Sequence, residues 1–138
     1  MNAQARYLAA SVATATPARL VVMLYDRLVL DIIQGRDALA EHRFADADAH
    51  LRHAQDIVFE LRKSLRLDVW EGAAQLTSIY VWLIKELIGA NISRDAARAD
   101  ACRRLVEPLR DAWRQAAEMT GAHDPMGAPS AVPIAKAG

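Results

Sequence analysis

The sequence predicts an all-α protein: an antiparallel, up-down-up-down four-helix bundle over residues 16–119, preceded by a mobile N-terminal leader (1–15) and followed by a disordered C-terminal tail (120–138). Two observations lead to this class. Apolar residues between 16 and 119 recur at spacings of three and four, the period of an amphipathic helix, and alternating strand patterns are almost absent. The breaks between the periodic segments are short, which favours antiparallel neighbours in a bundle.

The first helix is predicted to begin at Thr16-Pro17 and to end near 41–43. Threonine suits the N-cap, and proline suits the first helical position because its missing N–H has no partner to lose there. Apolar residues follow in steps of four from Leu20. The polar residues are confined to a strip that we expect to face solvent: Asp26, Arg27, Asp31 and Gln34.

The second helix has the clearest seam for packing lengthwise on its neighbours. Its apolar residues alternate spacings of three and four: Phe44, Ala47, Leu51, Ala54, Val58, Leu61 and Leu65. A break is predicted at Leu67-Asp68. There the segment Asp68-Val69-Trp70-Glu71 fits a capping box, so the third helix is predicted to run from near Val69 to about Asn91, with Gly89 weakening its last turn.

The fourth helix is predicted from about Arg94 to Met119, with Ser93 or Asn91 as its cap. Pro108 lies well inside and removes one helical hydrogen bond, so we expect a kink, and two shorter helices remain an alternative. The buried face is predicted to have a central line flanked by Val106 and Trp113. That line consists of Ala101, Leu105, Leu109, Ala112 and Ala116.

Composition excludes several classes of function. The chain has 138 residues, 17 basic and 17 acidic side chains and no net charge, whereas nucleic-acid binding needs a basic surplus. A single cysteine, Cys102, cannot form an internal disulfide, and we expect it in the core. No apolar run is long enough for a signal peptide or a membrane-spanning helix. We therefore expect a cytoplasmic protein without nucleic-acid binding or membrane insertion.

The third helix has more apolar surface than one bundle face needs. Its predicted core face is Leu76, Ile79, Tyr80, Leu83, Leu87 and Ala90, whereas Val81, Ile84 and Ile88 form a second stripe more than a quarter-turn away. Trp82 lies elsewhere again, among polar neighbours. The second stripe either widens the core against an adjacent helix or forms a groove for another chain. As candidate binding residues we take Val81, Trp82, Ile84 and Ile88, with Ile57 at the edge of the second helix.

The chain resembles the flagellar secretion chaperone FliS family. The order and spacing of several short motifs carry the resemblance: Tyr7 with V-A-T-A-T-P (Val12 to Pro17), M-L-Y-D (Met23 to Asp26), A-Q-D-I-V-F-E-L (Ala54 to Leu61), L-T-S-I-Y (Leu76 to Tyr80), Ala90-Asn91, and L-R-D-A-W (Leu109 to Trp113). The resemblance implies a cytoplasmic chaperone that binds the disordered C-terminal segment of flagellin and prevents its polymerisation before type III secretion. It also implies that leader residues cover the groove in the free protein, for which the candidates are Tyr7, Leu8 and Val12.

Other functions receive little support from the residues. His50 and His53 have a spacing that metal ligands use on one helix, but no facing helix offers a partner motif, so we expect surface histidines. A histidine phosphotransfer domain is the alternative reading, although the residues after His53 do not suit it. A self-assembling module, forming a weak homodimer, is also open. Tyr25 and Tyr80 are expected in the core with their hydroxyls at its rim, and the alternative is that the hydroxyls shape the client groove. We expect no enzyme, metal or cofactor.

Overall fold

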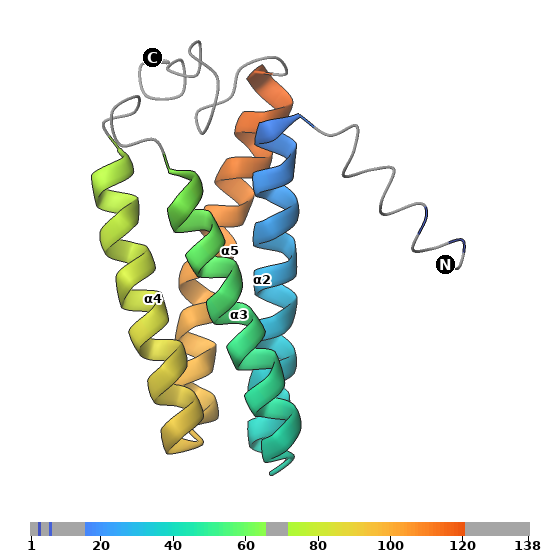
Figure 1. Ribbon diagram of the computed structural model, residues 1–138, viewed down its shortest axis with the longest axis vertical. Helices are drawn as coiled ribbons and strands as arrows, with labels where there is room; N and C mark the ends of the chain where they lie inside the picture. Colours follow the sequence, from blue (N-terminus) through green and yellow to red (C-terminus); the bar gives the residue numbers. More distant parts are fainter. Residues whose placement is uncertain (1–2, 4–5, 7–15, 66–71, 121–138) are drawn as a thin grey trace.

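The computed structural model describes residues 3, 6, 16–65 and 72–120, and the last two ranges form one bundle of four helices (Figure 1). The helices are α2 (Pro17–Ala40), α3 (Phe44–Ser64), α4 (Ala73–Ser93) and α5 (Ala96–Thr120). Successive helices run in opposite directions, α2 and α4 each pack against α3 and α5, and the described residues contain no strand (Figure 1). The predicted all-α, up-down-up-down bundle is confirmed. The proposed leader and tail fall almost entirely outside the described residues.

The start of α2 follows local chemistry, as predicted. The Thr16 hydroxyl accepts a hydrogen bond from the Arg19 backbone N–H at 3.1 Å, and Pro17 occupies the first helical position. The helix ends at Ala40 with Glu41 as its C-cap, inside the predicted range. A side-chain cap of this kind contributes about 1 kcal/mol, and it can be read directly from neighbouring residues.

The third predicted helix, α4, differs from the prediction at both ends. It begins at Ala73 after Gly72, so the predicted start near Val69 is wrong, while the predicted break and capping box lie outside the described residues. The helix continues past Gly89 to Ser93, two residues beyond the predicted end. A Cβ at Gly89 would lie 2.2 Å from the Arg98 guanidinium carbon, so the glycine makes room for that side chain.

The last helix, α5, corrects three predictions. Its first turn is capped by Asp95, whose carboxylate accepts from the Arg98 N–H at 3.1 Å, rather than by Ser93 or Asn91. It passes through Pro108 as one helix, so the two-helix alternative is wrong. The buried line is also shifted, because its fully covered members are Ala99, Cys102, Val106 and Trp113, whereas Ala112 is exposed.

The core runs the length of the bundle and contains one polar pair at its centre. Tyr25 and Tyr80 have no exposed surface, and their hydroxyl oxygens are 2.6 Å apart across the bundle. The prediction that these hydroxyls lie at the rim is therefore wrong. Burial raises the pKa of Tyr25 to about 12 and also raises the pKa of Tyr80. The Tyr25 ring stacks on Trp113 with centroids 6.4 Å apart.

A carboxylate is also buried where the sequence predicted a solvent strip. Asp31 has no exposed surface, and its charge is met by His53 and by Arg27, whose guanidinium nitrogen lies 3.2 Å from Oδ1. His50 Nδ1 lies 3.9 Å from the same oxygen. The two histidines are thus not simply solvated, because His53 contacts the buried carboxyl group directly and His50 lies beside it.

Candidate interaction surface

Four apolar residues on the outer side of α4 form a row that we call the α4 stripe: Val81, Ile84, Ile88 and Ile92. Their spacings of three and four keep them on one side of the helix. Val81 is 43%, Ile88 is 40% and Ile92 is 78% exposed, while Ile84 is half-buried against the core. The structure thus places Val81, Ile84 and Ile88 together, as the sequence predicted.

The exposed fractions of these side chains distinguish the two interpretations of the second stripe, which are core widening and a groove for another chain. Only Ile84 packs against the core, so the core-widening explanation accounts for one member and does not explain the exposed surface of the other three. The six residues predicted as the core face of the same helix do form it, with Ile79 half-buried and the others buried. The bundle core is therefore closed without the stripe. Sequence reasoning missed Ile92, which follows Ile88 by four residues, because the helix was expected to end at Asn91.

The α4 stripe lies on the part of the outer surface of α4 that is next to α3. Asn91 donates to Asp48 of α3 at 2.8 Å, and Ile84 precedes Asn91 by about two helical turns, which keeps both on that side. Phe59 follows Asp48 by about three turns and is 45% exposed, so it lies on the corresponding side of α3. Equal steps along the two antiparallel helices place Phe59 at the level of Tyr80, next to the start of the stripe.

Two other predicted residues do not join this surface. Ile57 is only 5% exposed and belongs to the core, so its predicted place at the edge of the second helix is wrong; Phe59 is the apolar residue that α3 exposes. Trp82 is 41% exposed, but it lies about 100° around α4 from Val81. Glu86, one turn beyond Trp82, pairs with Arg98 at 2.9 Å, so Trp82 lies on the α5 side. The groove-cover candidates Tyr7, Leu8 and Val12 are outside the described residues.

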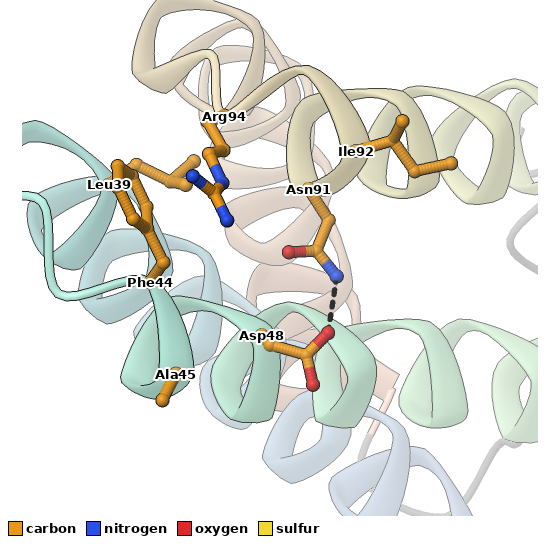
Figure 2. Close-up of a pocket in the computed structure, with 7 residues that line it drawn as sticks. All are labelled: Leu39, Phe44, Ala45, Asp48, Asn91, Ile92 and Arg94. Atoms are coloured by element: carbon orange, nitrogen blue, oxygen red, sulfur yellow. Dashed lines mark hydrogen bonds between the residues drawn. The ribbon is translucent and has the colours of Figure 1, made fainter.

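The stripe ends at a pocket of about 530 Å³ between the last turns of α2 and α4 and the first turns of α3 (Figure 2). Its walls combine four apolar side chains with one carboxylate, one amide and one guanidinium. The lining residues are Leu39, Phe44, Ala45, Asp48, Asn91, Ile92 and Arg94. The Arg94 guanidinium carbon lies 4.0 Å from the centre of the Phe44 ring, close enough for a cation–π contact. Ile92 belongs to both the stripe and the pocket.

The residues considered for chemistry are arranged for structural roles. Burial raises the pKa of the Cys102 thiol to about 12, which suppresses the thiolate that a nucleophile would need. In the described part of the chain, no three His, Cys, Asp or Glu side chains are grouped in a way that could hold a metal ion. His53 Nδ1 contacts the Asp31 carboxylate, an arrangement that fixes the ring. No helix within 16–65 or 72–120 has both the length and the apolar character needed to cross a membrane.

Comparisons with known proteins agree on one family. The family model described as "Flagellar protein FliS" matches residues 1–120. The flagellar secretion chaperone FliS of Bacillus subtilis is 31% identical over 115 residues, which cover 83% of this chain and 86% of the relative. The flagellar secretion chaperone FliS of Vibrio cholerae is 26% identical over 102 residues, covering 73% and 75% of the two chains.

Proposed function

This chain belongs to the flagellar protein FliS family, and on that basis we propose that it is a cytoplasmic export chaperone for flagellin. In this proposal it binds the C-terminal segment of flagellin and prevents premature polymerisation before type III flagellar secretion. The curated relatives carry the name flagellar secretion chaperone, which supports a client protein as the partner. Binding itself would involve no turnover and no cofactor.

The observation that carries the proposal is the exposed α4 stripe beside a core that is already closed. An apolar row of this length on one face of a helix suits helix-in-groove recognition, in which the client presents its own apolar residues at spacings of three and four. Phe59 would form the α3 wall of the groove. Trp82, on the other side of α4, would contact a client that wraps further around the helix.

The energies involved are moderate at each position. Fully burying a valine or isoleucine side chain contributes about 1.5–3 kcal/mol, so the half-exposed Val81 and Ile88 would each contribute about 1 kcal/mol when a client covers them. A client that folds on binding loses part of this gain, about 2–5 kcal/mol, to the cost of ordering. Affinity must therefore come from many contacts spread along the bundle.

Calorimetric titration with a synthetic peptide covering the C-terminal segment of the same organism's flagellin tests the proposal. We expect one-to-one binding with a negative heat-capacity change, since apolar surface is buried, and a gain of helical circular dichroism. The double variant Val81→Gln, Ile88→Gln should fold normally and bind at least about tenfold more weakly, because it removes about 2 kcal/mol of apolar burial.

A matched control is available on the opposite side of the bundle. Leu30 on α2 is 41% exposed, similar to the two stripe residues, and α2 packs on α3 and α5 rather than beside α4. Leu30→Gln should leave peptide affinity unchanged. If the stripe variant binds like the wild type, or if Leu30→Gln weakens binding equally, the stripe is not the binding surface. Sedimentation of the free protein would show whether a weak homodimer covers it instead.

One observation favours the phosphotransfer alternative enough to test it. The Asp31 carboxylate orients His53 through Nδ1, His53 is about half-exposed (51%), and the described residues provide no partner for Nε2. A carboxylate-oriented histidine is a suitable nucleophile. Incubation with a phosphorylated response regulator would then give acid-labile phosphate on the protein, and His53→Gln would abolish it. Absence of transfer would remove this alternative.

A further inference from the structure

The pocket at the end of the bundle adds a polar site to the end of the α4 stripe. Both include Ile92, so apolar surface is continuous from the outer side of α4 into the pocket. Its volume of about 530 Å³ lies in the usual range for sites that enclose a small group. A chain lying along the stripe towards the end of α4 would therefore reach a cavity instead of solvent.

The charged side chains that line the pocket favour an anionic ligand. Its carboxylate is already satisfied, because Asp48 Oδ1 accepts from the Asn91 amide at 2.8 Å and lies 3.9 Å from Arg52 Nε. The positive group of the pocket lacks such a partner. The Arg94 guanidinium stacks on Phe44 and has no hydrogen bond or ion pair with any residue that the structure describes. Figure 2 shows Arg94 beside the Phe44 ring and Asn91 turned towards Asp48.

The backbone conformation of Arg94 allows its side chain to be tested separately from the turn. Arg94 has φ 54° and His42 has φ 59°, and both follow a helix end in the left-handed region that favours glycine. Each lies in the same kind of turn, closed by the Asp95 N–H bond to Ala90 O at 2.9 Å and by the corresponding Arg43 N–H bond at 2.8 Å. Because non-glycine residues occupy both positions, this turn accepts a side chain, and Arg94→Gly can remove the guanidinium without straining the backbone.

We propose that this pocket receives the free C-terminus of the client, with Arg94 binding the terminal carboxylate and Leu39, Phe44 and Ile92 surrounding the last apolar side chain. This inference rests on the proposed function, because it assumes that a client segment lies on the α4 stripe. A chain end fits better than an internal residue for two reasons. The pocket lies at the end of the stripe. It also combines the Arg94 guanidinium with an apolar space large enough for one side chain. Capture of a terminal carboxylate is a known mode of peptide recognition.

The test compares two forms of the same flagellin C-terminal peptide, one with a free carboxylate and one amidated. By calorimetric titration, the wild type should bind the free acid more tightly by a factor on the order of ten, since a charge-assisted hydrogen bond is lost on amidation. Arg94→Gly should bind both forms equally, with the affinity of the wild type for the amide. It should fold at least as well as the wild type, because glycine suits the turn.

His42→Gly is the matched control. It relieves the same backbone conformation in the equivalent turn and changes a residue that touches the pocket only by stacking on Phe44, so it should keep the preference for the free acid. Arg94→Gln, which retains a long side chain, should lose the preference as Arg94→Gly does.

The possible outcomes separate this inference from the proposed function. Equal binding of both peptides by the wild type overturns the pocket assignment and leaves the chaperone reading intact. A preference that survives in Arg94→Gly overturns the role of Arg94. No binding of either form overturns both.

Discussion

Removal of the Tyr25 hydroxyl should destabilise the bundle more than removal of both hydroxyls of the buried tyrosine pair. Tyr25→Phe leaves the Tyr80 hydroxyl buried without its partner 2.6 Å away, and it also removes the acceptor of the Trp113 indole N–H. A buried group that loses its hydrogen bond costs about 1–3 kcal/mol. We therefore expect a loss of about 2–4 kcal/mol for Tyr25→Phe and about 1–2 kcal/mol for Tyr80→Phe, which leaves Trp113 with its acceptor.

The double variant Tyr25→Phe, Tyr80→Phe should be more stable than Tyr25→Phe alone, because no phenol hydroxyl then remains unpaired in the core. Urea unfolding followed by circular dichroism at 222 nm and by tryptophan fluorescence gives all the free energies needed for a double-mutant cycle. If the two single losses simply add, the hydroxyls do not interact, and the argument from the pair is refuted.

The same pair also predicts a loss of stability in alkali. Burial raises the pKa of Tyr25 to about 12 and raises that of Tyr80, so the folded state keeps both phenols protonated where the unfolded chain ionises them. A raised pKa in the folded state gives stability that is present below the unfolded pKa and is lost above it. Unfolding free energy should thus fall from about pH 10 upwards, and less steeply in the double phenylalanine variant.

Three further predictions follow from the packing. A Cβ on Gly35 would lie 2.7 Å from Leu51 Cδ2 in the core, so Gly35→Ala should lower the unfolding free energy by about 1 kcal/mol in urea titrations, whereas helix propensity alone would raise it. His53→Ala removes a hydrogen-bonding partner of buried Asp31 and should cost about 1–3 kcal/mol in the same assay; a cost near zero would mean that Arg27 suffices. Because burial raises the pKa of Cys102 to about 12, its thiol should react with a disulfide reagent at pH 8 only after urea unfolding, and fast reaction in the native state would contradict its burial.

The parts of the fold that could be predicted are those decided by neighbours in sequence. The Thr16 cap, the seam of α3 and the core face of α4 depend on spacing and local hydrogen bonding, and the structure has them as the sequence predicted. On α5 the sequence predicted one central line flanked by Val106 and Trp113, whereas the structure buries the flanking residues and leaves Leu105 and Leu109 half-buried. Which side of the helix faces the core depends on how α5 is rotated against α2 and α4, and periodicity alone does not fix that rotation.

The wrong predictions for Asp31 and Ile57 arise from contacts between helices that are distant in the sequence. Asp31 was assigned to solvent because its partner His53 comes from another helix, and pairing between helices is not visible in a single helical wheel. Ile57 and Phe59 are two residues apart, and which of them faces α4 depends on how α3 is rotated in the bundle. The structure buries Ile57 and leaves Phe59 exposed beside the α4 stripe.

The arrangement of the core also makes the proposed surface separable from folding. The groups that fix the packing of the bundle, the tyrosine pair and the Asp31 cluster, are buried on the inner side of the helices. Val81 and Ile88, by contrast, each leave about two fifths of their surface exposed, and Ile92 leaves 78%, which a partner could cover. Variants on the α4 stripe should therefore alter affinity at nearly constant stability. A stripe variant that unfolds the protein would indicate that these residues serve the bundle itself, and the core-widening reading would then be the correct one.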